Sequence, residues 1–179
     1  MPSPDRPGQD EYRPEFARYV ARVPDTDVLS ALDRQGEAWG AFLAAAPADL
    51  VAHRYAPDKW TVRQVVAHVL DTERVLAYRA LCIARGDATP LPGFDEEAYT
   101  AHAGPDPATL AALGDELLHL RRSSVLLFRR FAPEVWLRRG TASGHGITVR
   151  ALAYVMTGHV RHHGAVLLER YAMPGVPAA

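Results

Sequence analysis

The sequence predicts an all-α protein: a four-helix bundle with a short extra N-terminal helix and two long loops. Apolar residues recur at helical spacing in four stretches of about twenty residues, and capping or helix-breaking residues bound these stretches. The valines and tyrosines follow helical spacing too, rather than the alternation of a strand. With 48% hydrophobic residues among 179, the chain can bury one core, so we expect a single bundle.

The first two long helices are expected over 26–46 and 61–85. The second has a well-defined start, because Thr61 and Gln64 have the spacing of a capping box. Gly86, which directly follows the predicted end, is a residue type that commonly terminates helices. Both segments therefore have the length and boundaries of bundle helices.

The last two long helices are expected over 107–131 and 149–171. Asp106 is a suitable cap for the third, since Pro107 would then take the first helical position. Pro174 prevents the fourth from continuing. Between the helices lie two long connections rich in glycine or proline, at 87–105 and 132–147. Connections of this length are often functional.

The chain divides by composition into a bundle and two flanking segments. Residues 1–24 are expected to form a loose tail, over 1–9, and then a short helix near 15–23. The bundle itself is expected over 25–173, followed by a second tail at 174–179.

Charge and cysteine content exclude several classes of protein. Twenty basic and twenty-one acidic side chains nearly cancel, so we expect neither a nucleic acid nor a membrane surface as partner. Cys82 is the single cysteine, which rules out an intrachain disulfide and fits a reducing compartment. Without a signal-like start or a long apolar run, a cytoplasmic protein is expected.

The eight histidines raise the question of a metal site. His159 and His163 are one turn apart and lie within roughly 30° of the mean apolar direction of the fourth helix, whereas His162 lies roughly 90° away. Such a pair can share one metal ion, as in zinc proteases, although the glutamate of the protease motif is missing here. The spacing leaves two alternatives open: two metal ligands, or two core histidines with separate hydrogen-bond partners.

A third ligand would have to come from another element. His68, in the second helix, lies at the edge of the apolar stripe and is the best candidate in a core helix. His119 is opposite the leucine face of its helix, so it should be solvated. The other histidines lie in predicted loops: His53, His102 and His145.

Three segments resemble one known family. They are 59–71 at the start of the second helix, 94–99 (Phe-Asp-Glu-Glu-Ala-Tyr) in the following loop, and 158–163 in the fourth helix. In this order they are similar to the DinB-like superfamily, and within it to the branch described as metal-dependent hydrolases, close to the bacillithiol-transferase-like proteins. The resemblance extends over roughly residues 25–172 and implies a four-helix bundle.

The resemblance also implies a divalent metal held by three histidines. The family positions fall on His68, His159 and His163, and His162 matches a position that is not a ligand. One ion per chain is implied, with zinc as the default and nickel as an alternative. The implied activity is hydrolysis of a small molecule or thiol S-transfer to it, with a low-molecular-weight thiol as a possible partner. The resemblance also implies a homodimer. A non-catalytic metal-binding or interaction module with the same bundle is the alternative.

General acid and base residues are not assigned by the sequence. Asp71 and Glu73 follow His68 closely and could orient an imidazole or act as an acid or base. A solvated face with Arg74 as ion-pair partner is the favoured interpretation. Three loop carboxylates could line the mouth, cap a short helix or face water: Asp95, Glu96 and Glu97. Trp60 is expected to be a packing anchor at the start of its helix. Tyr154 could be a core residue, an interface residue or a hydrogen-bond donor near the ion. Arg161 and Arg170 are expected to reach solvent or a partner chain.

Overall fold

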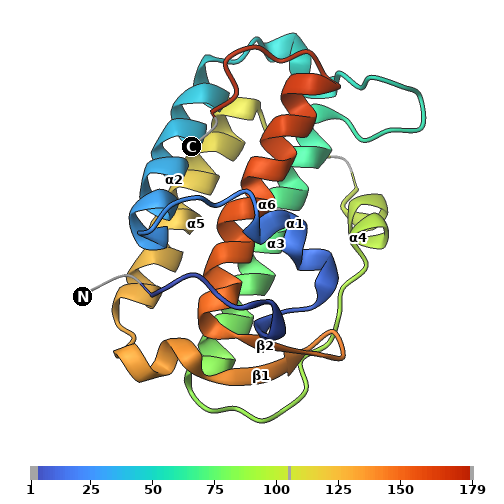
Figure 1. Cartoon of the computed structure of the whole chain (residues 1–179). Coiled ribbons are helices and arrows are strands. Elements are labelled where there is room, and N and C mark those ends of the chain that lie inside the picture. Colours follow the sequence, from blue (N-terminus) through green and yellow to red (C-terminus); the bar gives the residue numbers. More distant parts are fainter. Residues whose placement is uncertain (1–3, 105, 178–179) are drawn as a thin grey trace.

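Four long helices form the bundle in the computed structural model, which describes residues 4–104 and 106–177. They are α2 (Val28–Ala45), α3 (Val62–Ala84), α5 (Leu110–Arg129) and α6 (Val149–Glu169). Helices α2 and α3 each pack against both α5 and α6 (Figure 1). The predicted all-α four-helix bundle is therefore confirmed.

The helix boundaries follow local hydrogen bonding. The predicted capping box at Thr61 is present, since its hydroxyl accepts from the backbone N–H of Gln64 and the Gln64 side chain accepts from the Thr61 N–H. The predicted cap of the third long helix is wrong. Asp106 instead forms a local turn by accepting from the Ala108 N–H, and Thr109 caps α5 three residues later.

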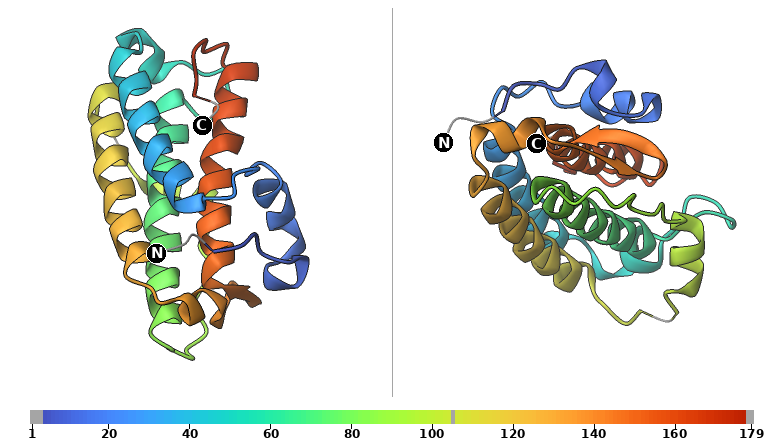
Figure 2. Two further views of the ribbon diagram at one scale, coloured as in Figure 1. Left: turned by 60° about the vertical axis from the view of Figure 1, so that its left-hand side comes forward. Right: turned by 90° about the horizontal axis from the view of Figure 1, so that it is seen from below.

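Shorter elements surround the bundle. Helix α1 (Ala17–Val20) confirms the short N-terminal helix and lies against the outer side of α6 (Figure 2). Helix α4 (Glu96–His102) lies beside α3 within the first predicted loop. Four short 3-10 helices complete the helical elements of the described range: Gln9–Glu11, Pro14–Phe16, Ala48–Ala52 and Pro133–Leu137.

The second predicted loop contains a β-hairpin that the sequence analysis missed. Strands β1 (Arg139–Ala142) and β2 (His145–Thr148) pair antiparallel. The two residues between them, Ser143 and Gly144, have φ values of 53° and 77°, as the tight turn of a two-residue hairpin requires. These strands are too short to show a clear alternation of apolar residues, which explains the omission.

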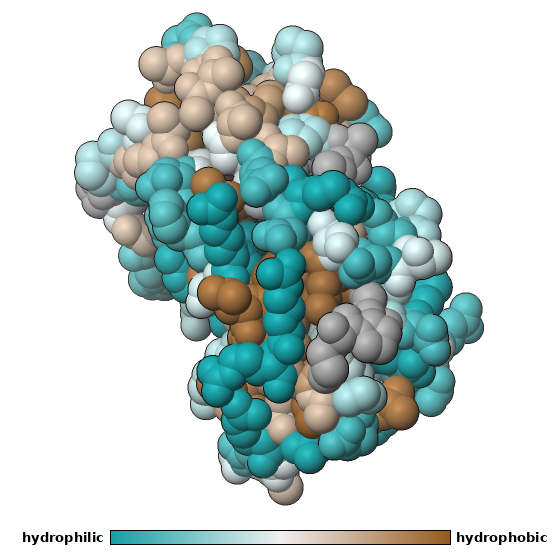
Figure 3. All heavy atoms as spheres, turned by 90° about the vertical axis from the view of Figure 1, so that its left-hand side faces the viewer, coloured by the Kyte–Doolittle hydropathy of each residue, from teal (hydrophilic) through white to brown (hydrophobic). Residues whose placement is uncertain are grey.

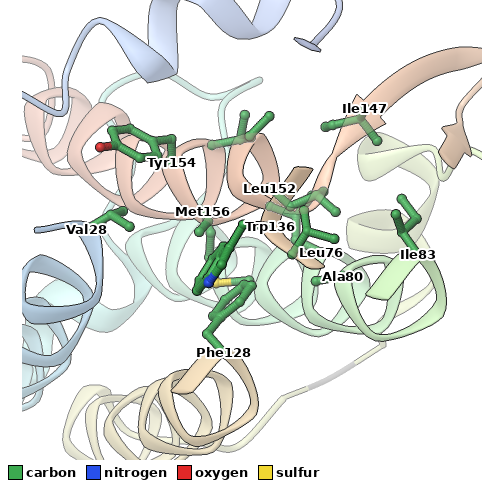
Figure 4. Close-up of a cluster of buried hydrophobic side chains, with 14 of the residues drawn as sticks. Val28, Leu76, Ala80, Ile83, Phe128, Trp136, Ile147, Leu152, Tyr154 and Met156 are labelled. Atoms are coloured by element: carbon green, nitrogen blue, oxygen red, sulfur yellow. The ribbon is translucent and has the colours of Figure 1, made fainter. Parts of the chain in front are cut away.

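The core is formed mainly by side chains of the long helices. Figure 4 shows Met156 and Leu152 of α6 facing Leu76 of α3, with Phe128 and Trp136 stacked beside them at a centroid distance of 5.4 Å. On the face drawn in Figure 3, hydrophilic residues gather over the middle and lower part, and more apolar residues lie toward the top. Within the described range, the helices are too short or too polar to cross a bilayer.

The N-terminal segment is more firmly attached than the predicted loose tail over residues 1–9. The Arg6 guanidinium donates to the carbonyls of Val20 and Val23 at 2.7 and 2.6 Å. Nearby, Glu11 is buried and accepts hydrogen bonds from Arg150 and Thr148. From Pro4 onward this segment therefore packs on the bundle, while residues 1–3 lie outside the described range.

Candidate metal centre

Three histidines from two helices converge inside the bundle. His68 projects from α3, and His159 and His163 project from successive turns of α6. The Nε2 atom of His159 lies 3.1 Å from the Nε2 atoms of both His68 and His163. One nitrogen from each ring can be chosen so that all three lie within 4.8 Å of one another. The three predicted ligands are thus brought together.

The donor set fits a divalent cation. Two nitrogens bound to one tetrahedral zinc, each at about 2.0–2.1 Å, lie about 3.3 Å apart, which is close to the observed spacing. The Nε2 atom of His159 faces a ring nitrogen of His68 and one of His163. In a neutral imidazole this atom is either a donor or an acceptor, and hydrogen bonding alone does not require three ring nitrogens to meet at one point. A shared cation would satisfy all three lone pairs.

Burial keeps these imidazoles neutral. His68 is 9% exposed and His159 is 5% exposed. Burial, followed by the neighbouring histidines, lowers the pKa of both His159 and His163 well below 6.5. Burial also lowers the pKa of His68, although Glu96 opposes this shift. Neutral imidazole is the form that binds a metal, so these rings are prepared for coordination.

Aromatic side chains hold the rings from two sides. Tyr19 of α1 makes edge contacts with His159 and His162, at centroid distances of 5.4 and 5.5 Å. Trp60, just before α3, lies 5.1 Å from the ring of His68 and donates from Nε1 to Glu97 of α4. Helices α1 and α4, which lie outside the bundle, therefore both contribute contacts to the site.

A cavity of about 190 Å³ leads to the histidines. His68 and His159 lie in its wall, together with Tyr19 and Thr72. Its basic side chains are Arg13, which precedes the Pro14–Phe16 helix, Arg18 of α1 and Arg79 of α3. Its acidic side chains are Glu15 and Glu96. The centre is thus buried by its helices but connected to a polar cavity that a small molecule could enter.

The sequence model of the DinB superfamily matches residues 31–167. This chain belongs to the DinB superfamily. A comparison with curated proteins gives no match. YfiT from Bacillus subtilis, described as a probable metal-dependent hydrolase with an unusual four-helix bundle topology, shares 17% sequence identity with this chain. The two structures superpose with a TM-score of 0.70, covering 97% of this chain and 95% of YfiT, so they have the same fold.

In this DinB protein, Asp71 and Glu73 do not lie on the solvated helix face that the sequence predicted. Glu73 is not on a solvated face but is 2% exposed, because it points toward α5 and pairs with Arg121 at 2.8 Å. Arg74 pairs instead with Glu116 of α5. Asp71 is half-buried and lines a second cavity beside His68, and burial raises its pKa.

The other sequence candidates have mainly structural contacts. In α4, Asp95 caps the helix by accepting from the Ala98 N–H, and Glu97 accepts from Trp60. Tyr154 is a core residue at 1% exposure. Arg161 does not extend to solvent but bonds to Asp25 and the Arg22 carbonyl, and Arg170 lies 3.4 Å from the Tyr55 hydroxyl.

The remaining histidines do not join the cluster. His119 is exposed, as predicted, and contacts the Asp115 carbonyl. His102 ends α4 rather than lying in a loop, and His145 begins β2; both are exposed. His53 is exposed before α3. His162 is half-buried against Tyr19 and has no place among the three converging nitrogens.

Sequence reasoning missed Tyr19, Thr72 and Arg79 in the cavity wall. Thr72 and Arg79 follow His68 by four and eleven residues, spacings that return to the same face of a helix. That periodicity could have identified both once His68 was chosen. Tyr19 offered no such signal, because its position depends on how α1 packs against α6.

Proposed function

We propose that this protein is a metal-dependent enzyme, with one divalent ion per chain held by His68, His159 and His163, and that it hydrolyses a small molecule. The observation that carries the proposal is the convergence of three neutral imidazole nitrogens beside a polar cavity. The description of YfiT as a probable metal-dependent hydrolase supports the same activity. Zinc is the default ion, because imidazole suits it and it is commonly available.

A divalent ion at this site would act as a Lewis acid and lower the pKa of a bound water or thiol. The remaining chemistry belongs to the chain. Glu96 lines the cavity and interacts electrostatically with His68, so it is our candidate for accepting a proton from the nucleophile. The aromatic contacts of Tyr19 and Trp60 hold the imidazoles in position, and Thr72 offers a hydroxyl to the substrate.

Thiol S-transfer is the second candidate. The observation that favours it is the excess of basic side chains in the cavity wall, three arginines against two glutamates. Such a wall would stabilise a thiolate or another anionic group of a low-molecular-weight thiol. Both activities need the same ion and cavity, and differ in which nucleophile enters.

The test is a screen of zinc-loaded protein against ester, amide and alkyl halide electrophiles, with and without added glutathione and cysteine. Turnover in water alone supports the hydrolase, and turnover only with thiol supports the transferase. Because His159→Gln removes a ligand, it should abolish either activity, whereas His119→Gln should retain it. No turnover in either arm, with one ion bound per chain, would favour the non-catalytic metal-binding module.

We also propose a cellular compartment and an oligomeric state for this enzyme. A reducing cytoplasm is consistent with the single cysteine, Cys82. A homodimer is consistent with large apolar side chains outside the core, among them Tyr78 at 58% and Leu126 at 61% exposure. Both fit a small-molecule enzyme without nucleic-acid or membrane partners.

A further inference from the structure

Arg79 has a buried charge that pairs with no acidic side chain in the part of the chain that the structure describes. The residue is 4% exposed. Toward the described residues, its guanidinium donates from Nη2 alone, to the Pro92 carbonyl at 2.7 Å and to the Ser143 hydroxyl at 3.0 Å. Neither acceptor is charged, and none of the ion pairs among residues 4–104 and 106–177 includes Arg79. Burying a cation without an anion is costly, so this arrangement calls for an anionic partner.

Arg79 lies in the wall of the same cavity as the histidines. It follows His68 by eleven residues, or about three turns and about 16 Å of rise, so the two side chains project from the same face of α3. Thr72 and Leu76 lie between them, and all four residues line the cavity. One elongated molecule in the cavity could therefore contact Arg79 and the histidine site at the same time.

The other charged groups in the wall do not compensate Arg79. Arg13 and Glu15 pair with each other at 3.0 Å. Arg18 donates to the Tyr19 hydroxyl and lies over its ring. Glu96 interacts electrostatically with His68. Burial, followed by the nearby Arg13, lowers the pKa of Arg79.

We propose that Arg79 binds a carboxylate or phosphate group at one end of the substrate, whose other end reacts at the three-histidine site. The inference rests on the proposed function and adds the substrate class: an elongated small anion. The Nε and Nη1 atoms of the guanidinium are not used in these two hydrogen bonds, so each can donate a charge-assisted hydrogen bond to an oxygen of such a group. Leu76 and Thr72 would contact the middle of the molecule.

The anion site can be tested without metal. In metal-free, nitrogen-15-labelled protein, inorganic phosphate should shift the Nε–H resonance of Arg79 saturably, and sodium chloride at equal ionic strength should not. The resonance is identified by its loss in Arg79→Lys. Ser143→Ala is the matched control: it removes a structural partner of Arg79 but leaves the charge, so the saturable shift should persist. A resonance that responds equally to phosphate and chloride overturns the proposal.

Binding at Arg79 and at the three-histidine site can then be tested together by calorimetry on zinc-loaded protein. Sebacate, with a carboxylate at each end, should bind about tenfold more tightly than decanoate, which has the same chain and one carboxylate. Arg79→Gln should remove this preference, and Ser143→Ala should keep it. Equal affinities in the unmodified protein would contradict the proposal. Failure to bind zinc while the phosphate response remains would overturn the proposed function alone.

Discussion

The three converging histidines should make the stability of the metal-free protein depend on pH. Histidines of the unfolded chain take up protons near pH 6.5. Burial keeps His159 and His163 neutral in the folded chain below that pH. The unfolded state then binds more protons, so the free energy of unfolding should fall as the pH is lowered below about 6.5.

Urea unfolding of metal-free protein between pH 8 and 5.5 checks this expectation. Glu11 does not interfere: although burial opposes it, hydrogen bonds from Arg150, Gly8 and Thr148 lower its pKa to about 2, so its contribution is lost only at more acidic pH. His159→Gln should flatten the pH dependence. A free energy of unfolding that stays constant down to pH 5.5 would contradict the expected neutrality of the buried rings.

The ion pair of Glu73 and Arg121 should be sensitive to loss of one partner. Both side chains are 1% exposed. Glu73→Ala leaves Arg121 buried without a counterion and should lower the free energy of unfolding by about 3–5 kcal/mol. The double variant Glu73→Leu with Arg121→Met should recover most of this loss, as thermal or urea unfolding would show. Equal losses in the single and double variants would rule out this electrostatic explanation.

At the scale of residues, the sequence identified the ligand candidates but not their surroundings. His159 and His163 could be paired because both lie on one helix, where periodicity fixes their relative direction. His68 required the family resemblance, since it lies at the edge of its stripe. The burial of Glu73 could not be predicted, because it depends on Arg121 of another helix facing the same point in the core.

At the scale of elements, the close packing of α1 on α6 depends on Gly158. A Cβ atom at this position would lie 2.0 Å from the Tyr19 carbonyl oxygen, a backbone atom that moves only with the whole segment. Gly158→Ala should therefore displace Tyr19 from His159 and cost about 1–3 kcal/mol of stability. Urea unfolding measures the loss, and zinc affinity reports the effect on the site.

Gly40→Ala is the matched control for this helix-interior substitution. The added Cβ would make only ordinary contacts there, the nearest at 3.4 Å to the Gly114 carbonyl oxygen. Alanine also favours the helix by roughly 0.5–1 kcal/mol. This variant should be neutral or more stable, with unchanged zinc affinity. If Gly158→Ala behaved in the same way, α1 would not be held as the structure indicates.

Element boundaries were predictable where capping is local and unpredictable where tertiary packing decides. The capping box at Thr61 could be identified from residue spacing alone. Asp106 resembles a helix cap equally well in sequence, yet it closes a turn and leaves the cap to Thr109. The hairpin of β1 and β2 is only four residues long on each side, and Ser143–Gly144 is its main local signal.

At the scale of the whole molecule, association is a separate prediction. Large apolar side chains remain exposed on α3 and α5, and a second chain could cover them. We expect light scattering at micromolar concentration to give about twice the chain mass of 19.6 kDa. A mass of one chain over the whole concentration range would count against the homodimer, and would leave the three-histidine site unaffected because both contributing helices belong to one chain.

The metal content of purified variants tests the central claim most directly. Elemental analysis of the unmodified protein should give about one divalent ion per chain, as zinc, or as nickel after nickel-affinity purification. Replacing His68, His159 or His163 by alanine should remove most of it, because each supplies one of the converging nitrogens. His119→Ala and His162→Ala should leave it nearly unchanged. Full occupancy in His163→Ala, or equal losses in His119→Ala and His159→Ala, would contradict the account.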